Sequence, residues 1–270
     1  MSSLLTLTTD FGTRDAYVAA MKGTILSIHP DVRFIDISHE ITPQDVMEAA
    51  FVLSEAVPYF PEETLHLVVV DPGVGTTRRP VALRHGGHTF VGPDNGLFAL
   101  LLDGEPPDEL VVLDRSAFWR TSDISDTFHG RDVFAPVAAH LAAGRALNDI
   151  GTPIESLKPL HWALPIDDDQ GVQGWVVHVD RFGNCITNIP RPLFERQRDG
   201  RPLKCFVGNA ILEGVHTTYG DTEAGEPLLL FGSSNFLEIA VNTGNASNLL
   251  DIRKGTPVNV LFKDVEPKSL

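Results

Sequence analysis

The sequence is poor in cysteine and contains no long apolar run. Its two cysteines, Cys185 and Cys205, are too few for a disulfide scaffold and form no Cys-x-x-Cys pair, which argues against thiol chemistry and a structural zinc site. We expect both to be small buried residues. No stretch approaches the roughly 20 apolar residues that a membrane span needs, and the N-terminus lacks the basic start of a signal peptide. The sequence therefore predicts a soluble, cytoplasmic protein that does not act on membranes.

Positive charge is also scarce. The chain has 21 Lys and Arg against 36 Asp and Glu, and its formal net charge is −15. Because binding to phosphates needs a basic face, we do not expect nucleic acid as a partner. The 270 residues, 43% of them hydrophobic, are sufficient for one large or two modest domains with real cores.

The first half of the chain alternates strand-like and helix-like segments. The run LHLVVV at 65–70 is typical of a strand buried on both faces, and Thr42 is placed as the N-cap of the second helix. This alternation predicts an α/β domain with a mostly parallel central sheet. Strands are expected at 4–9, 33–37, 65–70, 80–84 and 88–92, and helices at 15–28, 43–57, 96–102 and 132–143.

The pattern changes after Gly151. Residues 152–171 contain three prolines and no clear periodicity, which is typical of a linker. Strand-like segments separated by Gly-rich turns dominate the rest, and they indicate a smaller β-rich domain. We therefore expect an α/β domain over 1–155, a linker over 156–171 and a β-rich domain over 172–270.

Asp71 follows the apolar strand and begins the segment DPGVGTTRR. Ligands of open parallel sheets bind beyond the carboxyl ends of the strands, so this carboxylate is well placed for a site. Gly73 and Gly75 allow the backbone to approach a ligand closely. Arg78 can return toward Asp71 from the same loop. A salt bridge within the loop, made by Arg78 or Arg79, explains the same pattern equally well.

Asp10 repeats this arrangement at the end of the first strand. A carboxylate there can accept hydrogen bonds from the two hydroxyls of a ribose. The same residue could instead cap the helix that starts near Asp15. The following residues, Phe and Gly, spell a kinase tripeptide, but no other kinase motif accompanies them.

His129 lies with Gly130 in a polar turn just before a helix, within DTFHGRDVFAP (126–136). A histidine in that position can act as a base or orient water near neutral pH. Taken alone, a histidine in such a turn is more often a surface or capping residue. The ten histidines show no spacing of the His-Glu-x-x-His kind, so no metal site is expected.

The segment DRFGNCITN (180–188) places Asp180, Phe182 and Asn184 in one tight turn. Asn can read the edge of a base, Phe can stack on a ring, and Asp can hold an ammonium group. An ordinary β-hairpin with Asn-rich turn chemistry is the alternative. Residues 232–247 likewise offer hydroxyl and backbone groups to a polar ligand, or form two ordinary strands.

Taken together and in this order, these segments resemble the S-adenosylmethionine hydroxide adenosyltransferases, which are relatives of the fluorinating and chlorinating enzymes. The resemblance covers nearly the whole chain. The matching segments are TTDFGTRDAYV, DISHEITPQDV, VVVDPGVGTTRRPVA, VGPDNGL, DTFHGRDVFAP, DRFGNCITNI and GSSNFLEIAVN.

This resemblance implies an α/β domain, a β-rich domain and a homotrimer with a small-molecule substrate bound between neighbouring subunits. It implies that Asp71, Arg78 and His129 handle the attacking water, without a cofactor or a metal. The substrate contacts that it implies are Asp10 for the ribose, Phe128 as a wall of the site, Phe182 and Asn184 for the adenine, Asp180, Ser233 and Ser234 for the methionine, and Asn242.

Two motifs separate water from halide as the nucleophile. Fluorinating members resemble YPATGT where this chain has DPGVGT, and FYS where it has FHG. Asp71 and His129 thus occupy the Tyr positions, and Gly130 replaces a halide-contacting Ser. A carboxylate repels a halide but accepts a hydrogen bond or a proton from water. A departure is Gln44, where the fluorinating relatives carry Trp.

The resemblance therefore implies hydrolysis of S-adenosylmethionine to adenosine and L-methionine. Two alternatives remain open. One is a halide-using enzyme of the same fold, and the other is a non-catalytic sensor of S-adenosylmethionine or adenosine.

Overall fold

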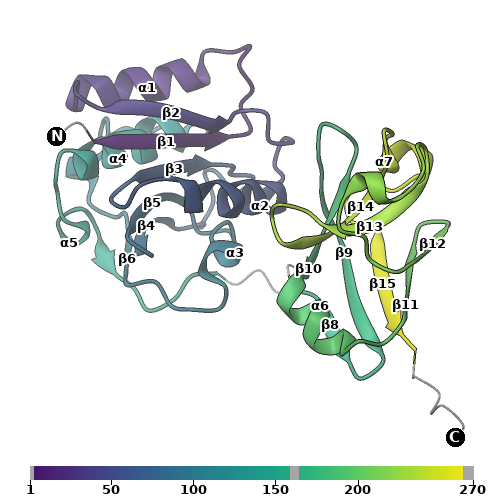
Figure 1. Ribbon diagram of the computed structural model, residues 1–270. Helices are drawn as coiled ribbons and strands as arrows, with labels where there is room; N and C mark the ends of the chain where they lie inside the picture. The colour runs from purple at the N-terminus through teal and green to yellow at the C-terminus, as the bar shows by residue number, and fades with distance from the viewer. Residues whose placement is uncertain (1–2, 159–163, 264–270) are drawn as a thin grey trace, which may run out of the picture. The chain divides into compact units, whose positions relative to one another are not determined.

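The computed structural model describes residues 3–158 and 164–263, and the chain divides into two units, Met1–Leu160 and His161–Leu270. Figure 1 shows a helix-flanked sheet in the first unit and a sheet with little helix in the second. Part of the linker expected over 156–171, namely 159–163, lies outside the described residues. In the part of the chain that is described, no helix is long and apolar enough to cross a membrane.

The first unit has a seven-stranded sheet of order β2-β1-β3-β5-β4-β6-β7. Neighbours from β2 to β5 run parallel, whereas β4 pairs antiparallel with β5 and β6, and β6 pairs antiparallel with β7. The strands are β1 (Leu4–Thr9), β2 (Arg33–Ser38), β3 (Leu65–Val69), β4 (Pro80–His85), β5 (His88–Pro93), β6 (Glu109–Val112) and β7 (Thr152–Pro153).

The expectation of a mostly parallel sheet is therefore wrong. The antiparallel part of the sheet arises from the hairpin between β4 and β5, where Gly86 and Gly87 take φ values of +57° and +80°. These left-handed conformations suit a tight two-residue turn that reverses the chain. Because β5 takes the place beside β3, β4 is carried to the outer side in the opposite direction. Half of the sheet is consequently antiparallel.

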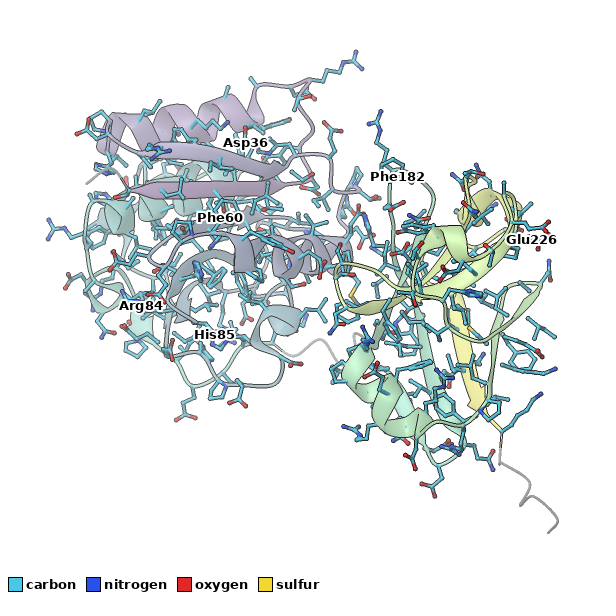
Figure 2. All side chains as sticks on the ribbon, in the orientation of Figure 1. Asp36, Phe60, Arg84, His85, Phe182 and Glu226 are labelled. Atoms are coloured by element: carbon cyan, nitrogen blue, oxygen red, sulfur yellow. The ribbon has the colours of Figure 1, made fainter. Side chains whose placement is uncertain are left out.

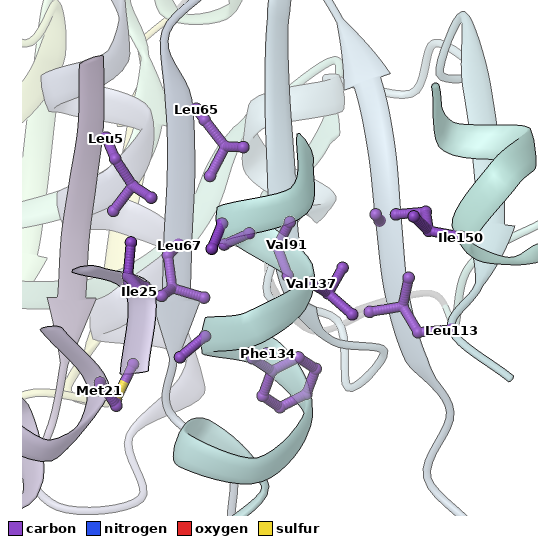
Figure 3. Packing of buried hydrophobic residues seen from close by; sticks show 14 of the residues in the cluster. Leu5, Met21, Ile25, Leu65, Leu67, Val91, Leu113, Phe134, Val137 and Ile150 are labelled. Carbon is purple, nitrogen blue, oxygen red and sulfur yellow. The ribbon is translucent and has the colours of Figure 1, made fainter. Parts of the chain in front are cut away.

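Helices cover both faces of this sheet. Met21 and Ile25 of α1 and Val137 of α4 pack on one face, against a cluster that includes Leu67 (Figure 3). On the other face, α2 and α3 pack against a second cluster around Phe90. The elements are α1 (Tyr17–Ile28), α2 (Val46–Ala56), α3 (Ala99–Leu102), α4 (Ala135–Ala142), α5 (Leu147–Ile150), the 3₁₀ turns η1 (Val57–Tyr59) and η2 (Ser116–Phe118), and the π-helical turn η3 (Gly130–Phe134).

The strand β3 shows why this packing fixes the site. Leu67 belongs to the cluster on one face and Val68 to the cluster on the other, and both are fully buried. Burying each such side chain stabilises the fold by about 1.5–3 kcal/mol. The end of β3 is therefore held between two cores, and the loop that follows starts from a rigid point.

The helix α2 begins later than the sequence suggests. The expectation that Thr42 caps it is wrong, because the carboxylate of Asp45 accepts the capping hydrogen bond from the amide of Glu48 (3.1 Å). Gln44, just before it, takes a φ of +67° and so ends the preceding turn outside the helix. A carboxylate caps a helix as well as a hydroxyl does. Asp45 is the cap rather than Thr42 because Asp45 directly precedes the first turn of the helix.

The second unit is β-rich, as expected. Its sheet has the order β12-β11-β15-β9-β10-β14-β13, with β8 added beside β9, and these strands pair antiparallel. Cys185 and Cys205 are buried in its core, as predicted. The elements are β8 (Ile166–Asp168), β9 (Gly171–Val179), β10 (Cys185–Pro190), α6 (Arg191–Arg198), β11 (Leu203–Val207), β12 (Ala210–Glu213), the 3₁₀ turn η5 (Tyr219–Asp221), β13 (Pro227–Phe231), β14 (Phe236–Val241), α7 (Ala246–Leu249) and β15 (Pro257–Phe262).

Candidate active site

Asp71 lies two residues beyond the end of β3 and forms a buried ion pair with Arg78. The Arg78 Nε atom donates to Asp71 Oδ1 at 3.0 Å, and Nη2 donates to Asp71 Oδ2. Both side chains are only 6% exposed. This two-point contact fixes the plane of the carboxylate as well as its position. The structure thus contains the salt bridge that the sequence offered as one interpretation, in a buried setting.

The loop from 71 to 78 is folded by its own hydrogen bonds. The Val74 amide donates to the Asp71 carbonyl (3.2 Å), and the Arg78 amide donates to the Thr76 hydroxyl (3.3 Å). Gly75 has a φ of +74°, and a Cβ there would lie 2.4 Å from the carbonyl oxygen of Asp126. No other residue would fit, because both the conformation and the space exclude a side chain. The loop therefore returns Arg78 to Asp71.

His129 completes a cluster of three side chains, which we call the Asp71 cluster (Asp71, Arg78 and His129). Its Nδ1 atom lies 3.3 Å from Arg78 Nη2. The Arg78 guanidinium also lies over the ring of Phe134, with 5.2 Å from its carbon to the ring centroid. His129 stands at the N-cap of η3, one residue before Gly130. The guanidinium is thus held from three sides.

Burial and neighbouring charges shift the pKa values of Asp71 and His129 in this cluster. Burial raises the pKa of Asp71 above its ordinary value, although Arg78 opposes this shift. Burial, followed by the charge of Arg78, lowers the pKa of His129. His129 is therefore neutral at neutral pH. Because a guanidinium has no acceptor, Nδ1 must accept from Arg78, and the proton of His129 is then on Nε2.

The cluster also contains an unused donor. Among the described residues, Arg78 Nη1 is buried and has no hydrogen-bond partner. A buried N–H group without a partner costs about 1–3 kcal/mol, so such groups are usually retained for a ligand or a water. The cluster can thus offer donors at Arg78 and His129 and an acceptor at Asp71 to one small polar molecule.

Asp10 lies at the end of β1, and its Oδ2 atom accepts a hydrogen bond from the Gln44 amide (2.7 Å). It does not cap α1, whose N-cap residue is Ala16. No hydrogen bond between described residues joins Asp10 to the Asp71 cluster. Its other carboxylate oxygen, Oδ1, could accept from a ligand.

Phe128 belongs to an aromatic group on the same unit. Its ring centroid lies 5.8 Å from that of Phe11 and 5.1 Å from that of Tyr17, both with nearly perpendicular rings. The three rings line a cavity of about 320 Å³ together with Ser125, Thr127 and Arg131. Since Phe128 directly precedes His129, this wall is joined covalently to the Asp71 cluster.

The second unit holds the other expected residues, beginning with the turn between β9 and β10. Asp180 Oδ1 accepts from the amides of Phe182 and Asn184, and Oδ2 accepts from the Asn184 side chain, each at 2.9 Å. Phe182 is 75% exposed (Figure 2). Gly183, between them, has a φ of +87° and packs against Asn245. The hairpin chemistry that the sequence left open is thus present, and it presents Phe182 outward.

Ser233 and Ser234 lie in the turn between β13 and β14, which is closed by a hydrogen bond from the Asn235 amide to the Gly232 carbonyl (3.0 Å). Asn242 uses its side-chain amide to donate to the Thr222 carbonyl (2.7 Å), so at least one of its groups supports the chain. The expected site residues thus fall into two groups, one in each unit.

Two buried carboxylates near these groups were missed by the sequence analysis. Asp132 is fully buried and bound by arginines, and Glu238 is buried and accepts a hydrogen bond from Tyr219 Oη (2.8 Å). Burial raises the pKa of Glu238. A charged residue inside the apolar stretch FLEIAV was the available signal for Glu238, and the adjacent Arg and Asp after His129 were the signal for Asp132. In the described ranges, no group of three His, Cys, Asp or Glu residues could hold a metal ion.

Comparisons with known proteins agree over nearly the whole chain. The family described as SAM hydroxide adenosyltransferase matches with its N-terminal domain over residues 5–151 and with its C-terminal domain over 174–259. A protein of Thermus thermophilus named (R)-S-adenosyl-L-methionine hydrolase is 40% identical over 265 residues, which cover 93% of this chain and 97% of that protein. One of the same name from Methanocaldococcus jannaschii is 34% identical, with 96% of each chain covered.

More distant relatives include a fluorinase of an Actinoplanes species, which is 27% identical over 292 residues. The match covers 95% of this chain and 97% of the fluorinase. Among solved structures, the crystal structure of an uncharacterized conserved protein from Thermotoga maritima matches with a TM-score of 0.86 at 37% identity. It covers 96% of this chain and 99% of that chain.

Proposed function

The chain belongs to the S-adenosylmethionine hydroxide adenosyltransferase family, and we propose that it hydrolyses S-adenosyl-L-methionine to adenosine and L-methionine. The relatives named hydrolases are 34–40% identical to it, whereas the relatives named fluorinases are 26–27% identical. The observation that carries the proposal is the buried Asp71 cluster, which offers donors and an acceptor to one water molecule.

The reaction needs one nucleophile and one proton acceptor. The oxygen of water attacks the 5′ carbon of the ribose in line with the carbon–sulfur bond, and the bonding pair leaves with the sulfur. Methionine departs as a neutral thioether, so no general acid is required. The proton of the water is taken up by the protein and then by solvent. Positioning of the water is therefore the main task of the site.

The three side chains divide this task. Asp71 accepts one proton of the water, and the electron pair of that O–H bond becomes available for attack on the 5′ carbon, while Arg78 Nη1 and the Nε2–H of His129 donate hydrogen bonds to the oxygen. Two oxygens of Asp71 already accept from Arg78, but a carboxylate has about four acceptor positions and can take a further bond. The raised pKa of Asp71 makes it a better proton acceptor than an ordinary aspartate.

The same charges disfavour a halide. Asp71 and Arg78 form a pair without net charge, and His129 is neutral at neutral pH. A halide at this point would meet the Asp71 carboxylate without a surplus positive charge to hold it. Halogenation is therefore the second candidate, and the 26–27% identical fluorinases support it.

The substrate contacts are proposed from the family resemblance together with local geometry. Asp10 would bind the ribose hydroxyls through its available oxygen, and the exposed ring of Phe182 would stack on the adenine, with Asn184 beside it. Asp180, Ser233 and Ser234 would bind the methionine part. We also propose a cytoplasmic homotrimer with the substrate between neighbouring subunits, and chemistry without a cofactor or a metal ion. Phe128 and Asn242 complete the proposed set of contacts.

Product analysis tests this function. Purified protein is incubated with S-adenosylmethionine, with and without added chloride, and the products are separated by chromatography. We expect adenosine and methionine in equal amounts, at a rate that chloride does not change. A 5′-halogenated nucleoside would instead support the halide-using alternative. Binding in a calorimeter without any product over hours would support the sensor.

A further inference from the structure

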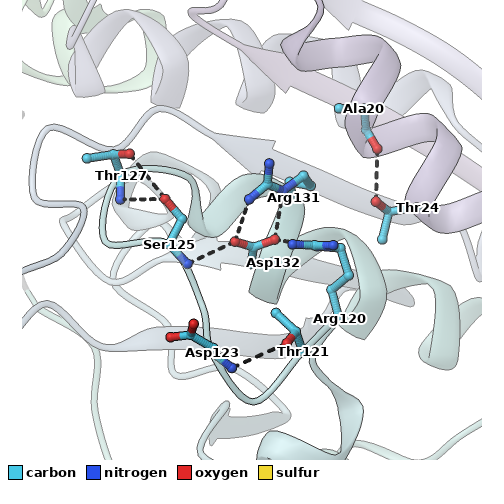
Figure 4. A network of polar contacts seen from close by, with 9 residues as sticks. All are labelled: Ala20, Thr24, Arg120, Thr121, Asp123, Ser125, Thr127, Arg131 and Asp132. Carbon is cyan, nitrogen blue, oxygen red and sulfur yellow. Dashed lines mark hydrogen bonds and ion pairs between the residues drawn. The ribbon is translucent and has the colours of Figure 1, made fainter.

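A fully buried carboxylate, Asp132, lies three residues after His129 and is held by charged partners. Asp132 Oδ1 accepts from Arg131 Nε (2.7 Å) and Arg120 Nε (2.5 Å), and Oδ2 accepts from Arg131 Nη2 (2.8 Å) and the Ser125 amide (3.0 Å). Figure 4 shows these bonds converging on the one side chain. We call this group the Asp132 clasp (Arg120, Ser125, Arg131 and Asp132).

The clasp closes the loop that leads into the Asp71 cluster. Arg120 stands at the start of this loop and Ser125 in its middle, and the loop ends at His129. A backbone hydrogen bond joins the same two residues, because the Arg120 amide donates to the Asp132 carbonyl (2.9 Å). The chain on the N-terminal side of His129 therefore cannot move without breaking bonds to a buried charge.

The clasp also reaches Phe128. The Arg131 guanidinium lies 5.0 Å from the centroid of the Phe128 ring, in the geometry of a cation–π contact. The Asp132 amide donates to the Phe128 carbonyl (3.2 Å). Phe128, the residue directly before His129, is thus tied to Arg131 through its ring and to Asp132 through its carbonyl.

The local backbone is unusual at this point. Residues Gly130–Phe134 form a π-helical turn, a rare conformation that is found mostly at functional sites. A Cβ at Gly130 would lie 3.2 Å from both Met21 Sδ and a ring atom of Phe128, so the turn is packed closely against the aromatic wall. The π-helical turn directs the side chains of Asp132 and His129 to different partners.

Stability alone is a weak reason for such an arrangement. Replacing a buried ion pair by well-packed apolar residues is often neutral or stabilising. Although burial opposes the charge of Asp132, the hydrogen bonds from Arg131, Arg120 and the Ser125 amide keep the pKa of Asp132 well below its usual range. The carboxylate is therefore a permanent charge, suited to hold geometry rather than to exchange protons.

We infer that Asp132 is a positioning residue for the hydrolysis proposed above: through Arg120, Arg131 and the Ser125 amide it holds His129 and Phe128 where attack by water requires them. This inference rests on the proposed function. It assigns to Asp132 no contact with the substrate or the water.

The variant Asp132→Asn tests it, because the amide keeps the size of the side chain and removes its charge. We expect kcat for adenosine formation to fall on the order of 10²-fold, since small displacements of a reacting group have effects of that size. KM is expected to change less than about threefold, because the loss affects the transition state rather than binding of the substrate.

A pH profile of kcat separates positioning from general loosening. The charged groups that face His129 are Arg78, Asp71, Asp126 and Asp132, and the negative charge of Asp132 raises the pKa of His129. Removing that charge lowers the pKa of His129 further. The acid limb of the profile, where His129 gains a proton, is therefore expected to move to lower pH in Asp132→Asn.

Asp123→Asn is the matched control, because Asp123 is an exposed aspartate of the same loop. It should keep the wild-type kcat, KM and pH profile. If Asp132→Asn does not fold, Arg131→Gln serves in its place, because it leaves Arg120 and the Ser125 amide on Asp132. We expect Arg131→Gln to lower kcat about tenfold and to lose the cation over Phe128.

Wild-type kcat and pH profile in folded Asp132→Asn would overturn the inference and leave the proposed function standing. So would losses of activity in Asp132→Asn and Arg131→Gln that merely follow the unfolded fraction measured by circular dichroism. If wild-type protein forms no adenosine from S-adenosylmethionine, the proposed function fails, and this inference fails with it.

Discussion

Asp71 and Asp132, two buried carboxylates of the first unit, have opposite properties. Both are almost inaccessible to solvent and both bind arginine. Asp71 has one arginine, and burial raises its pKa. Asp132 has two arginines and a backbone amide, which together overcome the effect of burial and lower its pKa. The number of donors thus separates a group that can take up a proton from one that cannot.

This difference fits the two roles that we propose for these carboxylates, which lie about 60 residues apart in the sequence. The Asp71 cluster keeps an unused donor and a carboxylate with capacity for another bond, as chemistry requires. In the Asp132 clasp, four hydrogen bonds occupy the carboxylate, as a fixed support requires. His129 belongs to the Asp71 cluster and lies three residues before Asp132, so in our proposal its position depends on both groups.

The comparison is tested most severely by Asp71→Asn. An amide in this position keeps the shape but cannot accept the proton, so kcat should fall on the order of 10³-fold, within the range found for general bases. Affinity for S-adenosylmethionine, measured by calorimetry, should change little. A variant with wild-type kcat would show that Asp71 is not the proton acceptor.

His129→Ala should have the next largest effect. We expect kcat to fall on the order of 10²-fold, because one donor to the water is lost while Asp71 and Arg78 remain.

The pH profile of the wild type is a further check, since Asp71 must be ionised and His129 neutral. With the pKa of Asp71 raised from about 3.9 and that of His129 lowered from about 6.5, the acid limb of the wild-type profile should lie between these values. An acid limb above pH 7 would contradict the assignment.

Phe182→Ala should affect binding rather than chemistry. The ring is 75% exposed in this chain, which is a large apolar surface to leave unused. Stacking of a base on an aromatic ring contributes about 1–3 kcal/mol, so KM should rise about tenfold or more while kcat stays within about twofold. Steady-state kinetics measures both. An unchanged KM would remove Phe182 from the proposed adenine contacts.

Acid unfolding addresses the comparison directly, through stability rather than activity. Because the folded-state pKa of Asp132 is depressed, its contribution to stability is present above the unfolded pKa of about 3.9 and is lost as the pH falls below it. Between about pH 4 and pH 2, the unfolding free energy of the wild type should fall by about 1.4 kcal/mol per pH unit more than that of Asp132→Asn. Equal slopes in urea titrations would show that Asp132 is not held ionised.

The sequence predicted most of the elements, because apolar periodicity reports burial directly. The buried strand at 65–70 and the hairpin around Gly86 and Gly87 were both found. The antiparallel pairing that follows from that hairpin was not predicted, since periodicity does not say which strand lies beside which. The helix cap was missed for a similar reason: Thr42 and Asp45 are both good caps, and only the turn at Gln44 distinguishes them.

The site was predictable where its partners are close in sequence. Asp71 and Arg78 lie seven residues apart in one loop, so their contact could be anticipated. The approach of His129, 51 residues later, depended on the family resemblance. The adjacent Arg131 and Asp132 were visible in the motif, but the burial of Asp132 was not, because it depends on Arg120 returning from the far side of a loop.

The central claim is that the Asp71 cluster delivers water to the 5′ carbon, and reaction in H₂¹⁸O tests it most directly. S-adenosylmethionine is converted by the wild-type protein in labelled water with chloride present, and the products are analysed by mass spectrometry. The account predicts one ¹⁸O atom in the 5′ hydroxyl of adenosine and none in methionine. Unlabelled adenosine, a 5′-chlorinated nucleoside or label in methionine would contradict it.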